Sequence, residues 1–276
     1  MDDLAEWEQY MKAIYAKSTV GSYLYGLRRF RQFVDGSLLE VTTQDVQDFI
    51  AQECQGWAQA TLRWFLGCLR SFYGWASQNS LVQESPLNGL TIPRKRSRRL
   101  PKVLSADEVG RLLRCELSSR DQAILLLMLD AGLRLTEVSR LVRANVDLQR
   151  RTILVQGKGD KERMVPLSER LHEALETWVY ESVGREPLAP LFPGYKEGPI
   201  RARGIGYIIA GIGEKAGLEE HLSPHCLRHT FATRLLRRGV NLRVVQELLG
   251  HANLATTQIY THVVAADMAE AINQLN

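Results

Sequence analysis

Residues 93–102, with the sequence PRKRSRRLPK, divide this chain into two parts. The segment carries six basic and no acidic side chains, whereas residues 1–92 carry 7 basic and 10 acidic ones and residues 103–276 carry 22 and 21. A cluster of like charges between two prolines is not expected to fold alone, so it predicts a linker between two domains. Such a cluster often binds nucleic acid or another acidic surface, and a solvated tether is the alternative.

The composition is that of a soluble globular protein, with 276 residues of which 45% are hydrophobic and 24% charged. The acidic beginning, MDDLAEWEQY, is unlike a signal peptide, and the longest strongly apolar run, Ile124 to Leu129, is too short for a bilayer span. The four cysteines form no CxxC pair, so we expect neither a disulfide framework nor a zinc site, and a reducing cytosol; they are Cys54, Cys68, Cys115 and Cys226.

Apolar spacing in residues 1–92 predicts short helices. Ser18 is a candidate N-cap for a helix whose apolar face runs from Val20 to Val34, and Thr42 or Thr43 begins another helix through Ile50. A third helix is predicted over residues 58–79.

The second part is predicted to be mostly helical with one small sheet. Ser105 and Glu108 form a capping box, and an apolar helix over residues 119–131 ends at Gly132. Residues 152–156 and 163–167 are β-prone and flank a hairpin turn, Gly157-Lys158-Gly159-Asp160. Further helices are predicted over 168–182, 203–216, 225–238 and 241–249, with a tail after Tyr260. The predicted fold class is mainly α with a small antiparallel β-sheet.

The segment Pro224-His225-Cys226-Leu227-Arg228-His229 is the densest cluster of reactive side chains. Proline suits a first helical turn, which puts His225 and Arg228 on one face, where an imidazole and a guanidinium can bind a phosphate. His225 and His229, four residues apart, could instead ligate a metal, but Cys226 replaces the glutamate of HExxH and no third ligand is evident.

Four other positions are weaker candidates when each is taken alone. Arg134, with Glu137 three residues on, is either a phosphate ligand or an ordinary surface ion pair. Lys158, between two glycines, is either a general acid or a turn residue, and its loop is not a nucleotide-binding loop. His251 and Tyr260 each have an ordinary structural role as the alternative.

Taken together and in order, these residues resemble the active-site set of the tyrosine recombinase (phage integrase) family. The matching segments are AGLRLTEVSRL, VQGKGDKERMVPL, SPHCLRHTFATRLLRRG and VQELLGHANLATTQIYTHV, within residues 100–265. The N-terminal part resembles the family's core-binding, SAM-like domain, and the compact layout is most like the Xer-type recombinases. Cys226 stands where many relatives have Asp, and the arm-binding domain of lambda-type integrases is not expected.

The resemblance implies a mechanism that uses neither a cofactor nor a metal. Tyr260 would attack a phosphodiester and form a 3′-phosphotyrosine. Arg134 and Arg228 would neutralise the phosphate oxygens, and Lys158 would protonate the leaving 5′-oxygen. His225 would assist proton transfer, His251 would donate to a phosphate oxygen, and Glu137 would orient the arginines.

The resemblance also implies partners: duplex DNA with an inverted-repeat core site, and a homo- or hetero-tetramer assembled on it that exchanges strands through a Holliday junction. The implied layout is a DNA-binding domain over 1–92, a catalytic domain over 103–262, and a helix over 263–276 that docks on a neighbouring protomer or in cis. The linker would bind DNA phosphates through Arg94, Lys95, Arg96, Arg98 and Arg99. We expect a cytoplasmic, nucleoid-associated enzyme. The alternatives are a type IB topoisomerase-like enzyme and a catalytically silent DNA-binding protein.

Overall fold

The structure is a computed structural model that describes residues 3–90, 102–157, 162–182, 186–195 and 198–250. The chain divides into two compact units, one ending at Arg98 and one beginning at Arg99, so the division falls within the predicted linker. Residues 93–101 of this linker lie outside the described ranges, whereas Lys102 is described and its Nζ lies 3.0 Å from the Glu220 carboxylate. Each unit has its own hydrophobic core.

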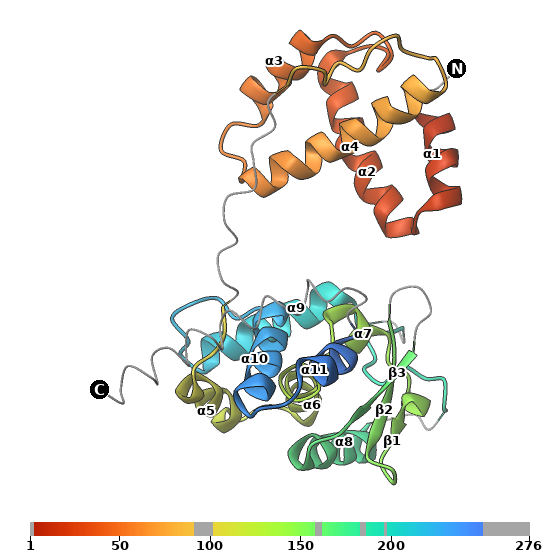
Figure 1. The fold of residues 1–276 in the computed structure, drawn as a ribbon. Coiled ribbons are helices and arrows are strands. Elements are labelled where there is room, and N and C mark those ends of the chain that lie inside the picture. The colour runs from red at the N-terminus through yellow and green to blue at the C-terminus, as the bar shows by residue number, and fades with distance from the viewer. Residues whose placement is uncertain (1–2, 91–101, 158–161, 183–185, 196–197, 251–276) are drawn as a thin grey trace. The chain divides into compact units, whose positions relative to one another are not determined.

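The first unit contains four helices in its described part, α1 (Asp3–Ile14), α2 (Lys17–Val34), α3 (Thr43–Glu53) and α4 (Gln59–Gln78) (Figure 1). Thr42 caps α3, with its hydroxyl accepting from the Asp45 N–H at 3.3 Å. The prediction that Ser18 caps α2 was wrong. The N-cap is Ala16, whose carbonyl accepts the Thr19 and Val20 N–H groups at 2.8 and 3.1 Å, so backbone bonds alone close this first turn.

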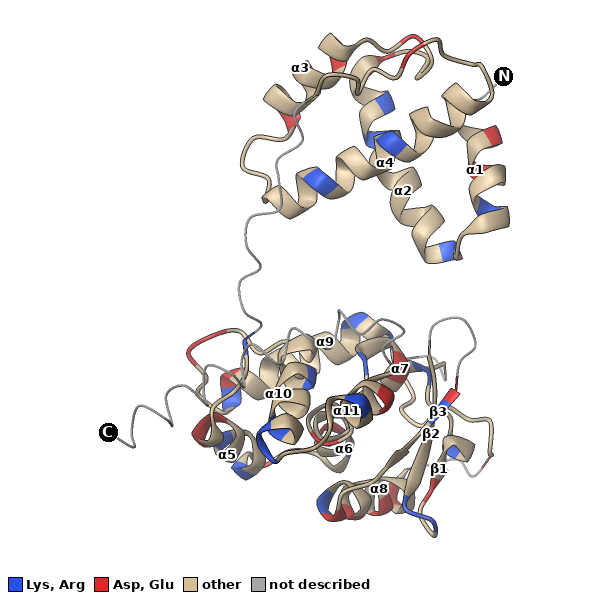
Figure 2. Ribbon diagram, viewed as in Figure 1, with Lys and Arg blue, Asp and Glu red and all other residues tan. Residues whose placement is uncertain are grey.

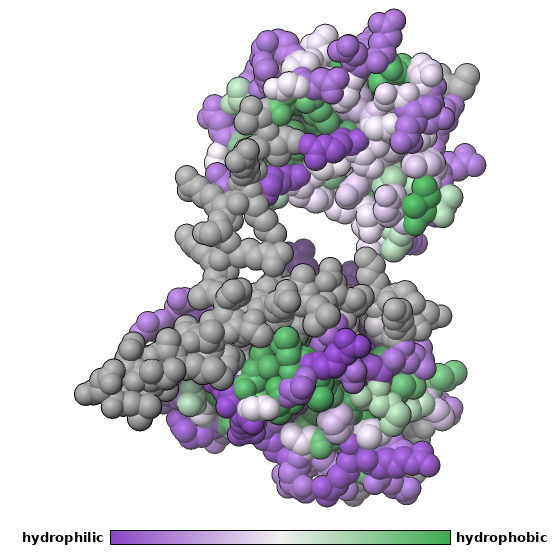
Figure 3. Space-filling view, viewed as in Figure 1, coloured by the Kyte–Doolittle hydropathy of each residue, from purple (hydrophilic) through white to green (hydrophobic). Residues whose placement is uncertain are grey.

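Aromatic side chains from three helices fill the core of the first unit. Phe30, Phe49 and Phe65 are fully buried, with ring centroids 5.2 Å apart for Phe30 and Phe49 and 4.8 Å for Phe49 and Phe65. The predicted apolar face of α2 points into this core, as do the buried residues of α4. On the face of this unit seen in Figure 3, apolar side chains are confined to small areas among polar ones.

Charge is unevenly distributed over the helices of the first unit. Helices α2 and α4, which contact each other, carry six basic and no acidic side chains: Lys17, Arg28, Arg29, Arg31, Arg63 and Arg70. The acidic side chains belong to α1, α3 and the connecting segments (Figure 2). Two adjacent helices therefore carry basic but no acidic residues of their own, although Arg28 pairs with Glu8 of α1 at 3.6 Å and Arg29 with Glu53 of α3 at 3.3 Å.

Helix α6 (Ser119–Leu129) forms the centre of the second unit. Residues 123–129 are all buried, because this helix is apolar all round and is covered by α8 (Glu169–Glu181) and α10 (Pro224–Arg237). It ends two residues before the predicted position, at Leu129. Helix α5 (Ala106–Arg114) begins at the predicted capping box, in which the Ser105 N–H donates to the Glu108 carboxylate at 2.8 Å.

The sheet of the second unit consists of β1 (Val146–Asp147), β2 (Thr152–Gln156) and β3 (Glu162–Pro166) in that order, all antiparallel. Val155 pairs with Arg163 across β2 and β3. Strand β3 begins one residue earlier than predicted, and β1 was missed because two residues are too few to show alternation. The mainly α fold with a small antiparallel sheet is confirmed.

Three more helices and a 3-10 turn complete the described part of the second unit. Helix α7 (Leu135–Arg140) follows α6 directly, and a 3-10 turn (Arg143–Asn145) precedes β1. Helix α9 (Ala202–Lys215) contacts α6 and α7, and α11 (Leu242–Leu249) contacts α10 and β3 (Figure 1). Within the described ranges, none of the helices has the length and apolar character needed to cross a membrane.

Candidate active site

The turn between α6 and α7 depends on Gly132. Its φ is +64°, a left-handed conformation that glycine adopts without strain, and a Cβ atom there would lie 2.4 Å from the Phe231 ring. A side chain is therefore excluded for two independent reasons. The turn presents the Gly132 carbonyl to α10 and sets Arg134 at the N-cap of α7.

Arg134 binds Glu137 through both its backbone and its side chain. The Arg134 N–H donates to Oε2 at 2.7 Å, and Nη1 donates to Oε1 at 2.7 Å. The Glu137 side chain is only 4% exposed, whereas that of Arg134 is 34% exposed. The alternative of an ordinary surface ion pair is therefore wrong, because the carboxylate is buried and needs partners to remain charged.

A second arginine, Arg163 on β3, binds the same carboxylate with both ends of its guanidinium. Nη1 donates to Oε1 at 2.9 Å and Nη2 to Oε2 at 2.8 Å, and the side chain is 11% exposed. The sequence analysis missed this residue. Strand alternation contains the signal: Arg163 lies two residues before the buried Val165, so it points to the covered face, where a charge requires a partner.

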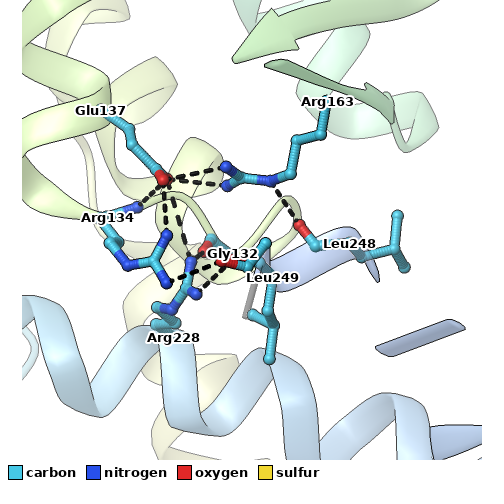
Figure 4. Close-up of polar contacts among 8 residues, drawn as sticks. Gly132, Arg134, Glu137, Arg163, Arg228, Leu248 and Leu249 are labelled. Atoms are coloured by element: carbon cyan, nitrogen blue, oxygen red, sulfur yellow. Dashed lines mark hydrogen bonds and ion pairs between the residues drawn. The ribbon is translucent and has the colours of Figure 1, made fainter. Parts of the chain in front are cut away.

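The third arginine, Arg228 on α10, is 5% exposed and lies beside the Gly132 and Leu249 carbonyls (Figure 4). Its Nη1 donates to the Gly132 carbonyl and lies 3.9 Å from Glu137 Oε2, and its Nη2 donates to the Leu249 carbonyl at 2.6 Å. Three guanidinium groups from α7, β3 and α10 thus surround one carboxylate.

The same three arginines bind the end of α11. Carbonyls at the C-terminus of a helix lack intrahelical partners and carry the negative end of the helix dipole, so cations stabilise them. Here three consecutive carbonyls each accept from a different arginine: Leu248 from Arg163 at 2.8 Å, Leu249 from Arg228 at 2.6 Å, and Gly250 from Arg134 at 3.3 Å. The cluster therefore holds the point from which the chain continues to His251.

The carboxylate of Glu137 is ionised in this setting. Burial alone would raise its pKa, but hydrogen bonds from Arg163 and Arg134, together with the charge of Arg163, lower the pKa of Glu137 to about 2. Three arginines against one carboxylate leave the cluster positively charged at neutral pH. Planar guanidinium groups with paired N–H donors are well suited to bind a phosphate.

Two histidines lie on α10 beside Arg228. His225 is in the first turn, which Ser223 caps, and is exposed; its ring centroid is 6.4 Å from that of His229. Burial, with smaller effects from His225 and Arg228, lowers the pKa of His229 to about 4, so His229 is neutral at neutral pH. Among the described residues, no group of three His, Cys, Asp or Glu side chains could hold a metal ion around this pair.

The structure thus brings together Arg134, Glu137 and Arg228, with His225 three residues before Arg228 on the same helix. Lys158, His251, Tyr260 and the five basic linker residues lie outside the described residues. Lys158 belongs to the connection between β2 and β3, and His251 directly follows Gly250.

Both units of the chain match models of known protein families. The phage integrase family model matches residues 102–266, and the model for the phage integrase N-terminal SAM-like domain matches residues 4–79. The tyrosine recombinase XerC of Bacillus subtilis (strain 168) is 39% identical over 267 residues, covering 90% of this chain and 87% of the relative. XerC of Actinobacillus pleuropneumoniae serotype 7 (strain AP76) is 40% identical over 233 residues, covering 81% and 75%.

Solved structures with the same fold are also recombinases. The XerA recombinase aligns with a TM-score of 0.58 at 30% identity, covering 100% of this chain and 99% of that one. The XerH site-specific recombinase, bound to palindromic difH substrate in a post-cleavage complex, aligns with a TM-score of 0.74 at 26% identity, covering 92% and 79%. The topoisomerase-like and silent DNA-binding alternatives are not favoured by these relatives. With both of its units matched and its relatives similar over most of their length, the chain belongs to the phage integrase family and is a site-specific tyrosine recombinase.

Proposed function

We propose that Arg134 and Arg228 bind the scissile phosphate of a DNA duplex and that Tyr260 attacks it. The O–P bond to Tyr260 forms as the bond to the 5′-oxygen breaks, which gives a 3′-phosphotyrosine and a free 5′-hydroxyl. The observation that carries this proposal is the convergence of guanidinium groups on the buried Glu137. Negative charge increases on the non-bridging oxygens during attack, and preorganised cations stabilise that charge more than they stabilise the ground state.

Proton transfers complete the proposed reaction. A free tyrosine has a pKa of about 10, so Tyr260 needs a neighbouring base or cations to attack at neutral pH. His225 assists that deprotonation, and His251 donates to a phosphate oxygen. Lys158 protonates the 5′-oxygen as it leaves. Rejoining reverses these steps and needs no nucleotide, because the phosphotyrosyl bond retains the energy of the cleaved bond.

The first unit is proposed to bind the duplex through α2 and α4. These helices carry six basic and no acidic side chains, and a basic surface gains affinity by displacing counterions from the phosphates. Linker residues Arg94, Lys95, Arg96, Arg98 and Arg99 extend this contact. Sequence readout comes from a helix in the major groove, for which α4 is the candidate. On this proposal the DNA-binding domain covers residues 1–92 and the catalytic domain 103–262.

The biological reaction is proposed to be Xer-like dimer resolution or the integration and excision of a mobile element. A tetramer assembles on an inverted-repeat core site and exchanges strands through a Holliday junction. It consists either of four copies of this chain or of this chain together with a homologous partner. The solved XerH complex, whose difH substrate is palindromic, supports the inverted-repeat form of the site by analogy. The helix over residues 263–276 docks on a neighbouring protomer, and the protein acts in the cytoplasm, at the nucleoid.

A nicked duplex that traps cleaved complexes tests the proposal. Its sequence is obtained by selecting random DNA for binding to the wild-type chain. The wild type is expected to form a covalent adduct, and Tyr260→Phe to bind the duplex with the same affinity and form none. An adduct in Tyr260→Phe would contradict the assignment of the nucleophile. Adduct formation is expected to persist in EDTA, and its abolition would favour a metal site at His225 and His229 instead.

A further inference from the structure

Arg163 differs from the two other arginines of the cluster in how its donors are used. Both terminal nitrogens bind Glu137, and Nε donates to the Leu248 carbonyl at 2.8 Å. Its side chain is 11% exposed, against 34% for that of Arg134 and 5% for that of Arg228, so the use of the donors and not the burial separates Arg163 from both. The proposed mechanism gives Arg163 no contact with the phosphate.

We infer that Arg163 is a positioning residue for the recombinase reaction, which holds Glu137 and the end of α11 in the geometry that Arg134 and Arg228 require. The inference rests on the proposed function, because it presumes that those two arginines bind the scissile phosphate. Its two parts are electrostatic and geometric.

The electrostatic part concerns the charge of Glu137. A carboxylate beside a phosphate site repels the phosphate and attracts the arginines that should bind it. Arg163, which belongs to β3, contacts both oxygens of the Glu137 carboxylate, at 2.9 and 2.8 Å, and so neutralises its negative charge. Without it, Glu137 would be balanced only by Arg134 and by Arg228, whose Nη1 lies 3.9 Å away. Less positive charge would then remain for a phosphate.

The geometric part concerns three segments that Arg163 joins (Figure 4). Its backbone belongs to β3, which follows the connection containing Lys158. Its side chain reaches Glu137 on α7 and the last turn of α11, where a Cβ on Gly250 would lie 3.0 Å from Arg163 Nη1 and 3.2 Å from Cδ. One side chain therefore ties the strand after Lys158 to the helix end before His251. A misplacement of about 1 Å costs an enzyme about 100-fold in rate.

The test compares Arg163→Met, Arg163→Lys and Arg151→Met in the full chain. Arg151 is the matched control, because it also binds both oxygens of a glutamate, Glu169, at 2.8 and 3.2 Å, but its side chain is 51% exposed. The probe is the nicked duplex selected from random DNA. Gel shift measures its affinity, and trapping of the covalent adduct measures the cleavage rate.

Arg163→Met is expected to bind the duplex within about threefold of the wild type and to cleave it about 100-fold more slowly. Arg163→Lys retains the charge but not the paired donors. Because of the retained charge, it should cleave at least about tenfold faster than Arg163→Met. Arg151→Met should match the wild type. Cleavage by Arg163→Met at the wild-type rate, or a loss no larger than its loss of affinity, would overturn the inference.

A double-mutant cycle with Glu137→Gln tests whether Arg163 acts through Glu137. If Arg163 acts through Glu137, Arg163→Met should lower the cleavage rate less than about tenfold in the Glu137→Gln background. The negative charge that Arg163 neutralises in the wild type is absent there. An equal cost in both backgrounds would overturn the electrostatic part of the inference, in which Arg163 acts through Glu137. If thermal melting shows Arg163→Met unfolded at 25 °C, the same comparison is made with Arg163→Lys. A wild type that yields no Tyr260-dependent adduct would instead contradict the proposed function, so the two failures are distinguishable.

Discussion

The Nη2 group of Arg228 donates to the backbone carbonyl of Leu249 at 2.6 Å, which joins the middle of α10 to the last residue of α11. The two residues are 21 positions apart. A proposed phosphate ligand and the helix end that leads to His251 are therefore parts of one buried hydrogen-bonded unit. Replacing Arg228 would remove a phosphate ligand and also release the end of α11.

Acid should destabilise the second unit through Glu137. Its pKa is lowered in the folded protein from an ordinary value of 4.5 to about 2, so its ionised form stabilises the fold above pH 4.5, and this contribution is lost as the pH falls through about 2. The contribution is about 3 kcal/mol. Urea unfolding of the wild type and Glu137→Gln, monitored by circular dichroism, measures the free energy of unfolding of each. The difference between the two free energies should decrease by this amount between pH 5 and pH 2. A constant difference would contradict the shifted pKa.

Gly132→Ala should impair both stability and cleavage. The new methyl group would lie 2.4 Å from the Phe231 ring and would move the carbonyl that Arg228 binds. Strain at positive φ costs about 1 kcal/mol and the clash about 1–3 kcal/mol more.

Gly239→Ala is the matched control for this substitution. Gly239 also has a positive φ, +79°, but a Cβ there would meet no atom within 4 Å. It should lose about 1 kcal/mol of stability, measured by urea unfolding, and cleave at nearly the wild-type rate. Equal losses in the two variants would show that backbone strain alone is responsible.

Asp130→Ala should destabilise the second unit by about 3 kcal/mol. The side chain of Asp130 is 5% exposed and binds Arg170 through both oxygens, accepts from the Ser168 hydroxyl at 3.0 Å, and lies 3.5 Å from Arg234. The control is Asp147→Ala, because Asp147 forms an exposed pair with Arg150 at 3.5 Å and should cost less than about 1 kcal/mol. Thermal melting of both variants measures the difference, and equal costs would contradict the buried network.

Neutralising the linker should weaken the salt dependence of DNA binding. Replacing Arg94, Lys95, Arg96, Arg98 and Arg99 with Gln removes five positive charges. If all five contact phosphates, a plot of the logarithm of the DNA-binding constant against the logarithm of the salt concentration should become shallower by up to about 4 units of slope. Gel shifts over a range of salt concentrations measure this slope. An unchanged slope would mean that the segment serves as a tether.

Deleting residues 263–276 should impair recombination while sparing the binding of one copy to a half-site. The segment has apolar residues at helical spacing, including Val264, Met268 and Ile272, and a helix of this length would need a groove for stability. Analytical ultracentrifugation on DNA measures tetramer assembly. Full recombination by the truncated chain would exclude the docking role.

Local sequence patterns were sufficient to predict most helices and both longer strands. The capping box at Ser105 and the apolar stripe of α2 depend on neighbouring residues, so they can be recognised without tertiary information. Where the prediction failed, the signal was too short or ambiguous. Strand β1 has two residues, and Ser18 looks like a cap although Ala16 precedes the helix.

The sequence by itself determined the family, the division into two parts and the residue types available for phosphate chemistry, because motif order and charge segregation are properties of the chain. Only the tertiary structure decided that Glu137 is buried, that Arg163 binds it, and that three arginines bind the end of α11. Burial and pairing depend on contacts between α7, β3, α10 and α11, which are distant in the sequence. From the sequence alone, a carboxylate three residues after Arg134 is indistinguishable from a surface ion-pair partner, because its burial depends on the contacts between these elements.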